Sequence, residues 1–176
     1  MLVALHDEAG LRSTADRIAA MGRRCLQYDA DISVEALSCE IIADVAGCLG
    51  AVHILVNNAG GDQPGGILEL TAEDWRRTLA LNLDSAFCWT RAAVPFLIPT
   101  GQGLVVVTSW MSAKNGGGGL PFSVSKPVYA AAKSGLLGLA RGLAVELGPS
   151  QVTVNAVCPG PSTRRPSKAS WTARLG

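Results

Sequence analysis

The sequence lacks a strong excess of charge and a long apolar run. Its 176 residues carry 15 Lys and Arg against 14 Asp and Glu, a net charge of +1. No bulk attraction to nucleic acid or to an anionic membrane is therefore expected. No apolar run approaches the roughly 20 residues that span a bilayer, and the N-terminus has no basic segment followed by an apolar stretch. We expect a cytoplasmic protein with no nucleic-acid partner and no membrane partner.

Metal-binding side chains are also scarce. The chain has two histidines and five cysteines, and no two cysteines are spaced as CxxC. No zinc site is predicted from so few ligands. The cysteines lie in apolar surroundings and are odd in number, so we expect buried free thiols in a reducing compartment rather than disulfides or metal ligands. They are Cys25, Cys39, Cys48, Cys88 and Cys158.

Short apolar segments alternate with longer helical patterns, as in a parallel sheet with crossover helices. The predicted strands are 2–5, 25–28, 52–57, 104–109 and 152–157, and the predicted helices are 8–21, 34–48, 72–96 and 127–147. Thr71 is expected to open the third helix, with Asp74 as the acidic partner of the first-turn amides. The length fits one α/β domain.

The last residues change character. Positions 164–176 contain several cations and no acid. We expect this basic tail to be poorly ordered. A nucleic-acid-binding module that uses the tail is a weak alternative, because Trp171 is its only aromatic residue.

Tyr129 and Lys133 are the most informative pair of residues. They are spaced i and i+4 in YAAAK, so on a helix they share one face. Moving a phenol from a pKa of about 10 to about 7 takes roughly 4 kcal/mol. One cation at about 4 Å supplies an energy of that order at an effective dielectric near 20. The pair therefore suits a tyrosine acid/base, although YxxxK alone is also five residues of an ordinary helix.

Several motifs occur together in a recognisable order. They are Asp31, NNAG at 57–60, Asn82, TSW at 108–110, Tyr129 with Lys133, and Pro159 with Gly160. Over about residues 2–163 this order resembles the short-chain dehydrogenase/reductase family. The resemblance implies a Rossmann-like doubly wound parallel sheet with helices on both faces and NAD or NADP as cofactor. It also implies interconversion of a small-molecule alcohol and carbonyl by hydride transfer, in a homo-oligomer (dimer or tetramer).

By resemblance, the cofactor's adenosine lies against the loop after the third strand. Asn58, Ala59 and Gly60 would line it, and Asp31 would accept from the adenine amino group. A plain strand-to-loop turn is the alternative for NNAG. Asp29 competes with Asp31, which could equally cap the following helix.

The nicotinamide side is implied in the same way. The backbone of Pro159 and Gly160 would face the nicotinamide, and Thr163 would meet the carboxamide or the pyrophosphate. Lys133 would bind the nicotinamide ribose, while Tyr129 would exchange a proton with the substrate oxygen.

Asn82 and a serine complete the implied catalytic set. Asn82 would kink its helix and hold a water that links Lys133 to solvent; a hydrogen-bonded core asparagine is the alternative. The serine that normally polarises the carbonyl falls on Trp110. Ser109 is favoured for that role because it ends a strand, with Ser112 as the other candidate.

Parts of the family pattern are missing. No TGxxxGxG turn is found, Leu5 stands where an acid selecting NAD is expected, and His6 is only a hint of NADP. The first strand of the sheet and the C-terminal substrate lid are not recognisable either. We therefore expect an incomplete Rossmann-type domain over 1–163. The alternative to an oxidoreductase is an incompetent remnant that dimerises through the helices 72–96 and 127–147.

Overall fold

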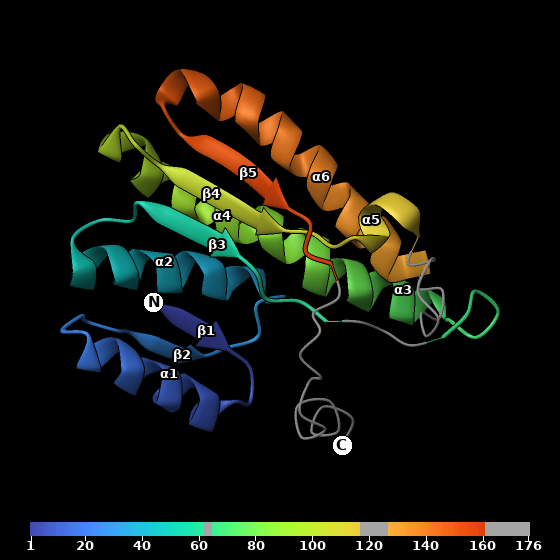
Figure 1. The fold of residues 1–176 in the computed structure, drawn as a ribbon, viewed down its shortest axis with the longest axis horizontal. Coiled ribbons are helices and arrows are strands. Elements are labelled where there is room, and N and C mark those ends of the chain that lie inside the picture. The colour runs from blue at the N-terminus through green and yellow to red at the C-terminus, as the bar shows by residue number, and fades with distance from the viewer. Residues whose placement is uncertain (62–64, 117–126, 161–176) are drawn as a thin grey trace.

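The computed structural model describes residues 1–61, 65–116 and 127–160 (Figure 1). Strands and helices alternate along the chain, as predicted. The strands are β1 (Leu2–Ala4), β2 (Gln27–Asp29), β3 (Ile54–Asn57), β4 (Leu104–Thr108) and β5 (Thr153–Val157). The helices are α1 (Glu8–Ala20), α2 (Glu35–Leu49), α3 (Ala72–Leu79), α4 (Ser85–Leu97), α5 (Ser112–Asn115) and α6 (Pro127–Leu147). Thr163 and the predicted tail at 164–176 lie outside the described residues.

Every strand pair is parallel, which confirms the predicted α/β class. Among the described residues the strands form two groups, β1 with β2 and β3 with β4 and β5. The second strand, predicted over 25–28, begins instead at Gln27, which pairs with Leu2 of β1. The first strand ends at Ala4, since the backbone turns at His6, whose φ is 53°. The His6 amide donates to Asp29 Oδ1 at 2.7 Å and fixes that turn.

The helices cover the two groups of strands unequally. Leu55, Val105 and Val107 are at most 4% exposed, and they pack with α2, α4 and α6 in one core. Helix α1 packs against β1 and β2 through Leu11 and Ala15, which lie outside that core. The face of β3 that carries Ile54 and Val56 is exposed. No helix among the described residues is long and apolar enough to cross a membrane.

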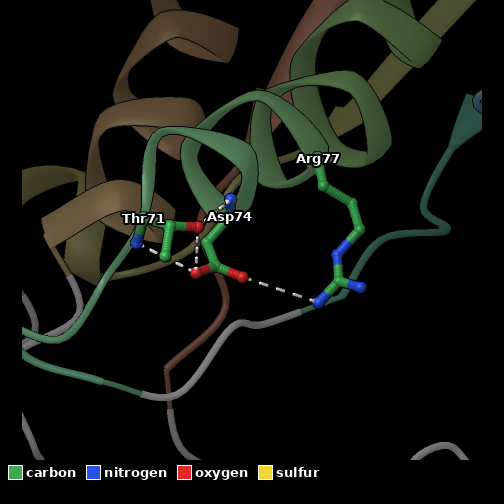
Figure 2. A network of polar contacts seen from close by, with 3 residues as sticks. All are labelled: Thr71, Asp74 and Arg77. Carbon is green, nitrogen blue, oxygen red and sulfur yellow. Dashed lines mark hydrogen bonds and ion pairs between the residues drawn. The ribbon is translucent and has the colours of Figure 1, made fainter.

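The predicted start of α3 is confirmed (Figure 2). Thr71 Oγ1 accepts from the Asp74 amide at 3.1 Å, and Asp74 Oδ2 accepts from the Thr71 amide at 2.9 Å. The Thr71 hydroxyl donates to the same carboxylate oxygen at 2.7 Å. These hydrogen bonds lower the pKa of Asp74 below its usual range. The reciprocal pair satisfies two amides that a helix end leaves without partners.

The single helix predicted over 72–96 is interrupted. A π-helical turn, Ala80–Asp84, separates α3 from α4, and the Ser85 amide donates to Ala80 O. Asn82 lies in this turn, and its Nδ2 donates to Thr78 O at 3.0 Å. In a regular α-helix the carbonyl of Thr78 accepts from the backbone amide four residues later. Here the side chain of Asn82 donates to that carbonyl, at the π-helical turn.

The cysteines are free, as expected, but none is buried. Cys39 and Cys48 are exposed, and the other three are half-buried. The expectation of burial was wrong because these side chains lie on helix surfaces or strand ends, although their sequence neighbours are apolar. Cys48 Sγ lies 3.5 Å from Asp44 Oδ1, and that hydrogen bond raises its pKa.

Replacing Thr71 with Ala tests the capping box. The variant loses the hydroxyl that accepts from the Asp74 amide, so we expect about 1 kcal/mol less stability to urea. Thr71→Ser keeps the hydroxyl and should lose at most a few tenths of that amount. Equal losses in both variants would show that the methyl group, and not the cap, stabilises this helix end.

Candidate active site

Lys133 is the buried charge around which the candidate site is built. It lies on α6 and is 4% exposed, and its Nζ donates to Thr108 O, at the end of β4, at 3.0 Å. The Ser109 hydroxyl donates in the other direction, to Lys133 O, at 2.7 Å. These two bonds hold the first half of α6 against the carboxyl end of β4. In open parallel sheets, ligands bind at this end of the strands.

Asn82 and Gly60 face the same ammonium. Asn82 is 2% exposed, and its Nδ2 donates to Gly61 O at 2.7 Å. Its Oδ1 is buried and has no partner among the described residues. A Cβ on Gly60 would lie 2.6 Å from that Oδ1 and 3.4 Å from Lys133 Nζ. The loop after β3, the π-helical turn and α6 therefore meet at one point, where an acceptor and a donor converge.

Tyr129 lies one turn before Lys133 on α6. It is half-buried, and Lys133 Nζ lies 5.4 Å from the centroid of its ring. Burial raises the pKa of Tyr129, and burial lowers the pKa of Lys133 to about 8. The lowered tyrosine pKa expected from the sequence is thus not found. A lysine that loses part of its charge near neutral pH stabilises a phenolate less than a full cation does.

The two serines have different surroundings. Ser109 is 1% exposed, and its only proton is used in the bond to α6. Ser112 begins α5, is 5% exposed, and its Oγ has no partner among the described residues. Trp110 lies between them and is half-buried. The structure therefore directs the Ser109 hydroxyl into the helix contact and leaves the Ser112 hydroxyl unpaired.

The residues implied for the cofactor lie at strand ends. Asn58, Ala59 and Gly60 are exposed after β3, and the preceding Asn57 donates from Nδ2 to Thr90 Oγ1 of α4 at 2.9 Å. That bond fixes the direction in which the loop leaves the strand. It was not found by sequence reasoning, because its partner is 33 residues away.

Asp31 is already engaged locally. Its Oδ1 accepts from the amide and the hydroxyl of Ser33, at 2.9 and 2.7 Å. Helix α2 begins only at Glu35, after Val34, so Asp31 closes the turn before the helix rather than capping it. Asp29, its competitor, accepts from His6.

Pro159 and Gly160 are exposed beyond the end of β5. Pro159 O accepts from the Met111 amide at 3.2 Å, which ties the ends of β4 and β5 together.

A cavity of about 280 Å³ lies between β1 and β3 and reaches part of the site. Asp31, Tyr129, Pro159 and Gly160 are not among its lining residues. Its polar end is lined by Asn58, Ala59, Asn82 and Lys133. Its apolar walls were missed by sequence reasoning, which treats each strand separately. Among the described residues, no group of three or more His, Cys, Asp and Glu side chains is placed to hold a metal ion.

Comparison with known proteins gives the family. The family model described as short chain dehydrogenase matches residues 1–173, and the chain belongs to that family. A dehydrogenase subunit of Thauera aromatica that acts on (2S)-[(R)-hydroxy(phenyl)methyl]succinyl-CoA is 34% identical over 154 residues, which are 88% of this chain and 59% of that protein. This chain is therefore related to oxidoreductases.

Two solved structures share the fold. A short chain dehydrogenase of Burkholderia cenocepacia in complex with NADP has a TM-score of 0.83 and 30% identity, over 95% of this chain and 66% of that one. Carveol dehydrogenase of Mycobacterium avium in complex with NAD has a TM-score of 0.78 and 30% identity, over 86% of this chain and 53% of that one. The chain spans somewhat more than half the length of the curated relatives that it matches.

Gly60→Ala tests the meeting point at the π-helical turn. The new Cβ has no room beside Asn82 Oδ1, so we expect a loss of about 1–3 kcal/mol in unfolding free energy. Gly138→Ala, on α6, meets nothing within 4 Å and should be neutral or stabilising by up to about 1 kcal/mol. Urea unfolding of both variants gives the comparison, and a neutral Gly60→Ala would contradict the close approach.

Lys133→Met tests the buried ammonium. Because the folded chain holds Lys133 with a pKa of about 8, below that of the unfolded chain, the folded chain binds fewer protons between these values. Stability should therefore rise with pH above about 8, by up to roughly 1.4 kcal/mol per unit, until the unfolded lysine also titrates near 10.4.

The methionine variant lacks this rise. The difference in free energy of unfolding between the parent and the variant should therefore change in favour of the parent from pH 8 to 10. Parallel pH profiles of the two proteins would contradict a lysine pKa lowered by burial.

Proposed function

We propose that this chain carries the catalytic part of an NAD(P)-dependent oxidoreductase that interconverts an alcohol and a carbonyl, with Tyr129 as acid/base. The observation that carries the proposal is the convergence of Lys133 Nζ, Asn82 Oδ1 and Gly60 at the carboxyl end of the sheet. Relatives of this family are named dehydrogenases, and two solved neighbours hold NAD and NADP. The substrate is a small-molecule alcohol or carbonyl.

The site residues fit such a cofactor. The buried Oδ1 of Asn82 has no partner among the residues that the structure describes, which leaves a place for a donor such as a water. The absence of a side chain on Gly60 keeps the space above Lys133 open. Lys133 would hold the ribose of the cofactor. The adenosine would contact Asn58, Ala59, Gly60 and Asp31, and the nicotinamide would contact Pro159 and Gly160. We also propose that Thr163 contacts the carboxamide or the pyrophosphate.

The chain's own residues then move the proton. When bound, NAD(P)H would supply the hydride that the carbonyl carbon accepts. Tyr129 gives its phenolic proton to the carbonyl oxygen, and the reverse transfers oxidise the alcohol. The raised pKa of Tyr129 keeps the phenol protonated at neutral pH, which suits the acid needed for reduction. Lys133 stands beside the phenol and stabilises the phenolate that remains, while Asn82 would hold a water that returns the proton through Lys133.

A hydroxyl that polarises the carbonyl completes the set. Ser109 and Ser112 are the two candidates, and a donor in this role must point at the substrate oxygen. Ser109 already donates to Lys133 O, whereas the Ser112 hydroxyl has no partner among the described residues. The hydrogen bonds therefore favour Ser112, and Ser109 becomes a residue that positions α6.

A dimerising scaffold without catalysis is the second candidate. Trp75 and Phe87, on α3 and α4, are 45% and 47% exposed, and Val145 on α6 is 81% exposed. Large exposed apolar side chains on neighbouring helices are typical of a protein interface. Self-association is compatible with both the oxidoreductase and the scaffold. Only an assay of catalysis by Tyr129 distinguishes between them.

Tyr129→Phe tests the chemistry in the chain as it stands. The assay is single-turnover oxidation of millimolar NADH or NADPH by a panel of aldehydes and ketones, because no glycine-rich phosphate turn is found in this sequence. We expect Tyr129→Phe to remove nearly all reduction and to leave cofactor affinity, measured by nicotinamide fluorescence, close to unchanged. The phenol acts only in the transition state.

Lys133→Ala is the matched variant and should weaken both cofactor affinity and rate, because the ammonium also holds the ribose. Ser112→Ala should slow turnover on the order of 10²–10³-fold. Binding of either cofactor without any reduction of the panel by the parent chain would favour the scaffold.

A further inference from the structure

The nitrogen of Lys133 lies directly beneath an exposed glycine. A Cβ on Gly60 would lie 3.4 Å from Lys133 Nζ, and Gly60 is exposed in the loop after β3. The lysine as a whole is 4% exposed. A small molecule that lies against the bare backbone of Gly60 is therefore within reach of this nitrogen, although the rest of the side chain is covered.

This nitrogen is a nucleophile near neutral pH. Burial lowers the pKa of Lys133 to about 8, so about one chain in ten carries the uncharged amine at pH 7. For an ordinary lysine, with a pKa near 10.4, the uncharged fraction is smaller by roughly two orders of magnitude. Only the uncharged amine has a lone pair that attacks a carbonyl carbon, and lysines that form Schiff bases in enzymes have a pKa lowered in this way.

Three polar groups around the nitrogen suit the formation of an imine. Asn82 Oδ1 is buried, has no partner among the described residues, and would lie 2.6 Å from a Cβ on Gly60, so it can accept from a hydroxyl formed at this point. The ring centroid of Tyr129 lies 5.4 Å from Lys133 Nζ, which brings an acid to the same place. Thr108 O accepts from Nζ at 3.0 Å, and an iminium, which keeps one N–H, can keep that bond.

We propose that Lys133 forms an imine with small aldehydes when no nicotinamide cofactor is bound. The nitrogen adds to the carbonyl carbon and passes a proton to the carbonyl oxygen, which gives a carbinolamine. The Tyr129 phenol protonates the carbinolamine hydroxyl, which leaves as water while the C=N bond forms. The phenolate then takes the remaining proton from the nitrogen. One aldehyde is consumed and one water is released, with no oxidation or reduction.

The phenol is in the right state for this step. Burial raises the pKa of Tyr129, so the phenol still carries its proton at the pH at which half of the lysine has lost its own. An acid and a neutral amine are thus present together. An aldehyde on Nζ also excludes the ribose of a cofactor from Lys133, and this competition, unlike the imine itself, rests on the proposed function.

The carbonyl compound has to be small. A side chain as short as a single Cβ at Gly60 would meet Asn82 Oδ1, so little room exists beside the nitrogen. A linear aldehyde presents one hydrogen and one narrow chain at the carbonyl carbon. A branched aldehyde of the same reactivity class would need space that Asn82 and Gly60 do not leave.

Borohydride trapping tests the proposal in the full chain without any cofactor. The chain is incubated with propanal at pH 8 and quenched with sodium borohydride, which reduces an imine to a stable secondary amine. Peptide mass spectrometry then compares propyl adducts at Lys133 with those at Lys114, an exposed lysine on α5. We expect the yield at Lys133 to be about tenfold higher or more, because of its larger uncharged fraction. An equal or lower yield at Lys133 would overturn the proposal.

Three controls show whether the folded site causes the preference. In concentrated urea the excess at Lys133 over Lys114 should disappear. With 2,2-dimethylpropanal, Lys114 should still be labelled and Lys133 should remain nearly unmodified. The yield at Lys133 should rise through pH 8 and level off near pH 9. A preference for Lys133 that persists in urea, or that is the same for both aldehydes, would contradict an imine formed in this site.

The two tyrosines of the chain give a matched pair of variants. Tyr129→Phe should slow the initial rate of adduct formation at Lys133 about tenfold or more, because loss of water from the carbinolamine then lacks its acid. Tyr28→Phe, on β2, should leave that rate unchanged. Equal rates in both variants would remove the phenol from the proposed step.

Trapping without cofactor and reduction with cofactor are separate measurements. Absence of the Lys133 adduct in a chain that reduces carbonyl compounds would overturn the imine alone. An adduct in a chain that reduces nothing would support the imine and contradict the proposed oxidoreductase.

Discussion

The burial of one ammonium group organises this molecule's functional end. A charged lysine in a low-dielectric environment is costly unless it is hydrogen-bonded, and within the described part of the chain Lys133 has one acceptor, Thr108 O, at 3.0 Å. That bond requires α6 to lie against the end of β4, and the Ser109 hydroxyl holds it there. Asn82 Oδ1, near the same ammonium, leaves no room for a side chain at Gly60. The packing of a helix against a strand end thus follows from a single buried charge, and Asn82 adds the loop at Gly60 to the same point.

Features that depend on neighbouring residues could be predicted from the sequence. The alternation of strands and helices, the capping box at Thr71 and the start of α6 at Pro127 are all local patterns, and the structure confirms them. Features that depend on distant partners could not. The direction of the Ser109 hydroxyl is decided by a carbonyl 24 residues away. The exposure of the cysteines depends on which faces other elements cover, and apolar neighbours in sequence do not report that.

The two groups of strands are held together by helices rather than by the sheet. Helices α2 and α4 pack along each other, and the Trp89 indole donates to Ile32 O at 3.0 Å. Arg91 and Glu35 form an ion pair between the same two helices, with Phe87 beneath the guanidinium. Exposed ion pairs of this kind add little stability, so the apolar contact has to supply most of it. Helices α2 and α4 therefore connect the β1–β2 pair to the group β3–β5, although no strand pairs across that boundary among the described residues.

The π-helical turn at Ala80–Asp84 lets the chain's length change at one point without disturbing the rest. Such a turn contains one residue more than an α-helical turn of the same rise. The residues of α4 that follow it therefore keep the orientation they would have in a continuous α-helix. If one residue of the turn were deleted, Thr78 and Trp89 would still face the core. The side chain of Asn82 would no longer point into the interior. The fold and the candidate site are thus separable by a single-residue deletion, so a descendant of this chain could keep its architecture after losing that site.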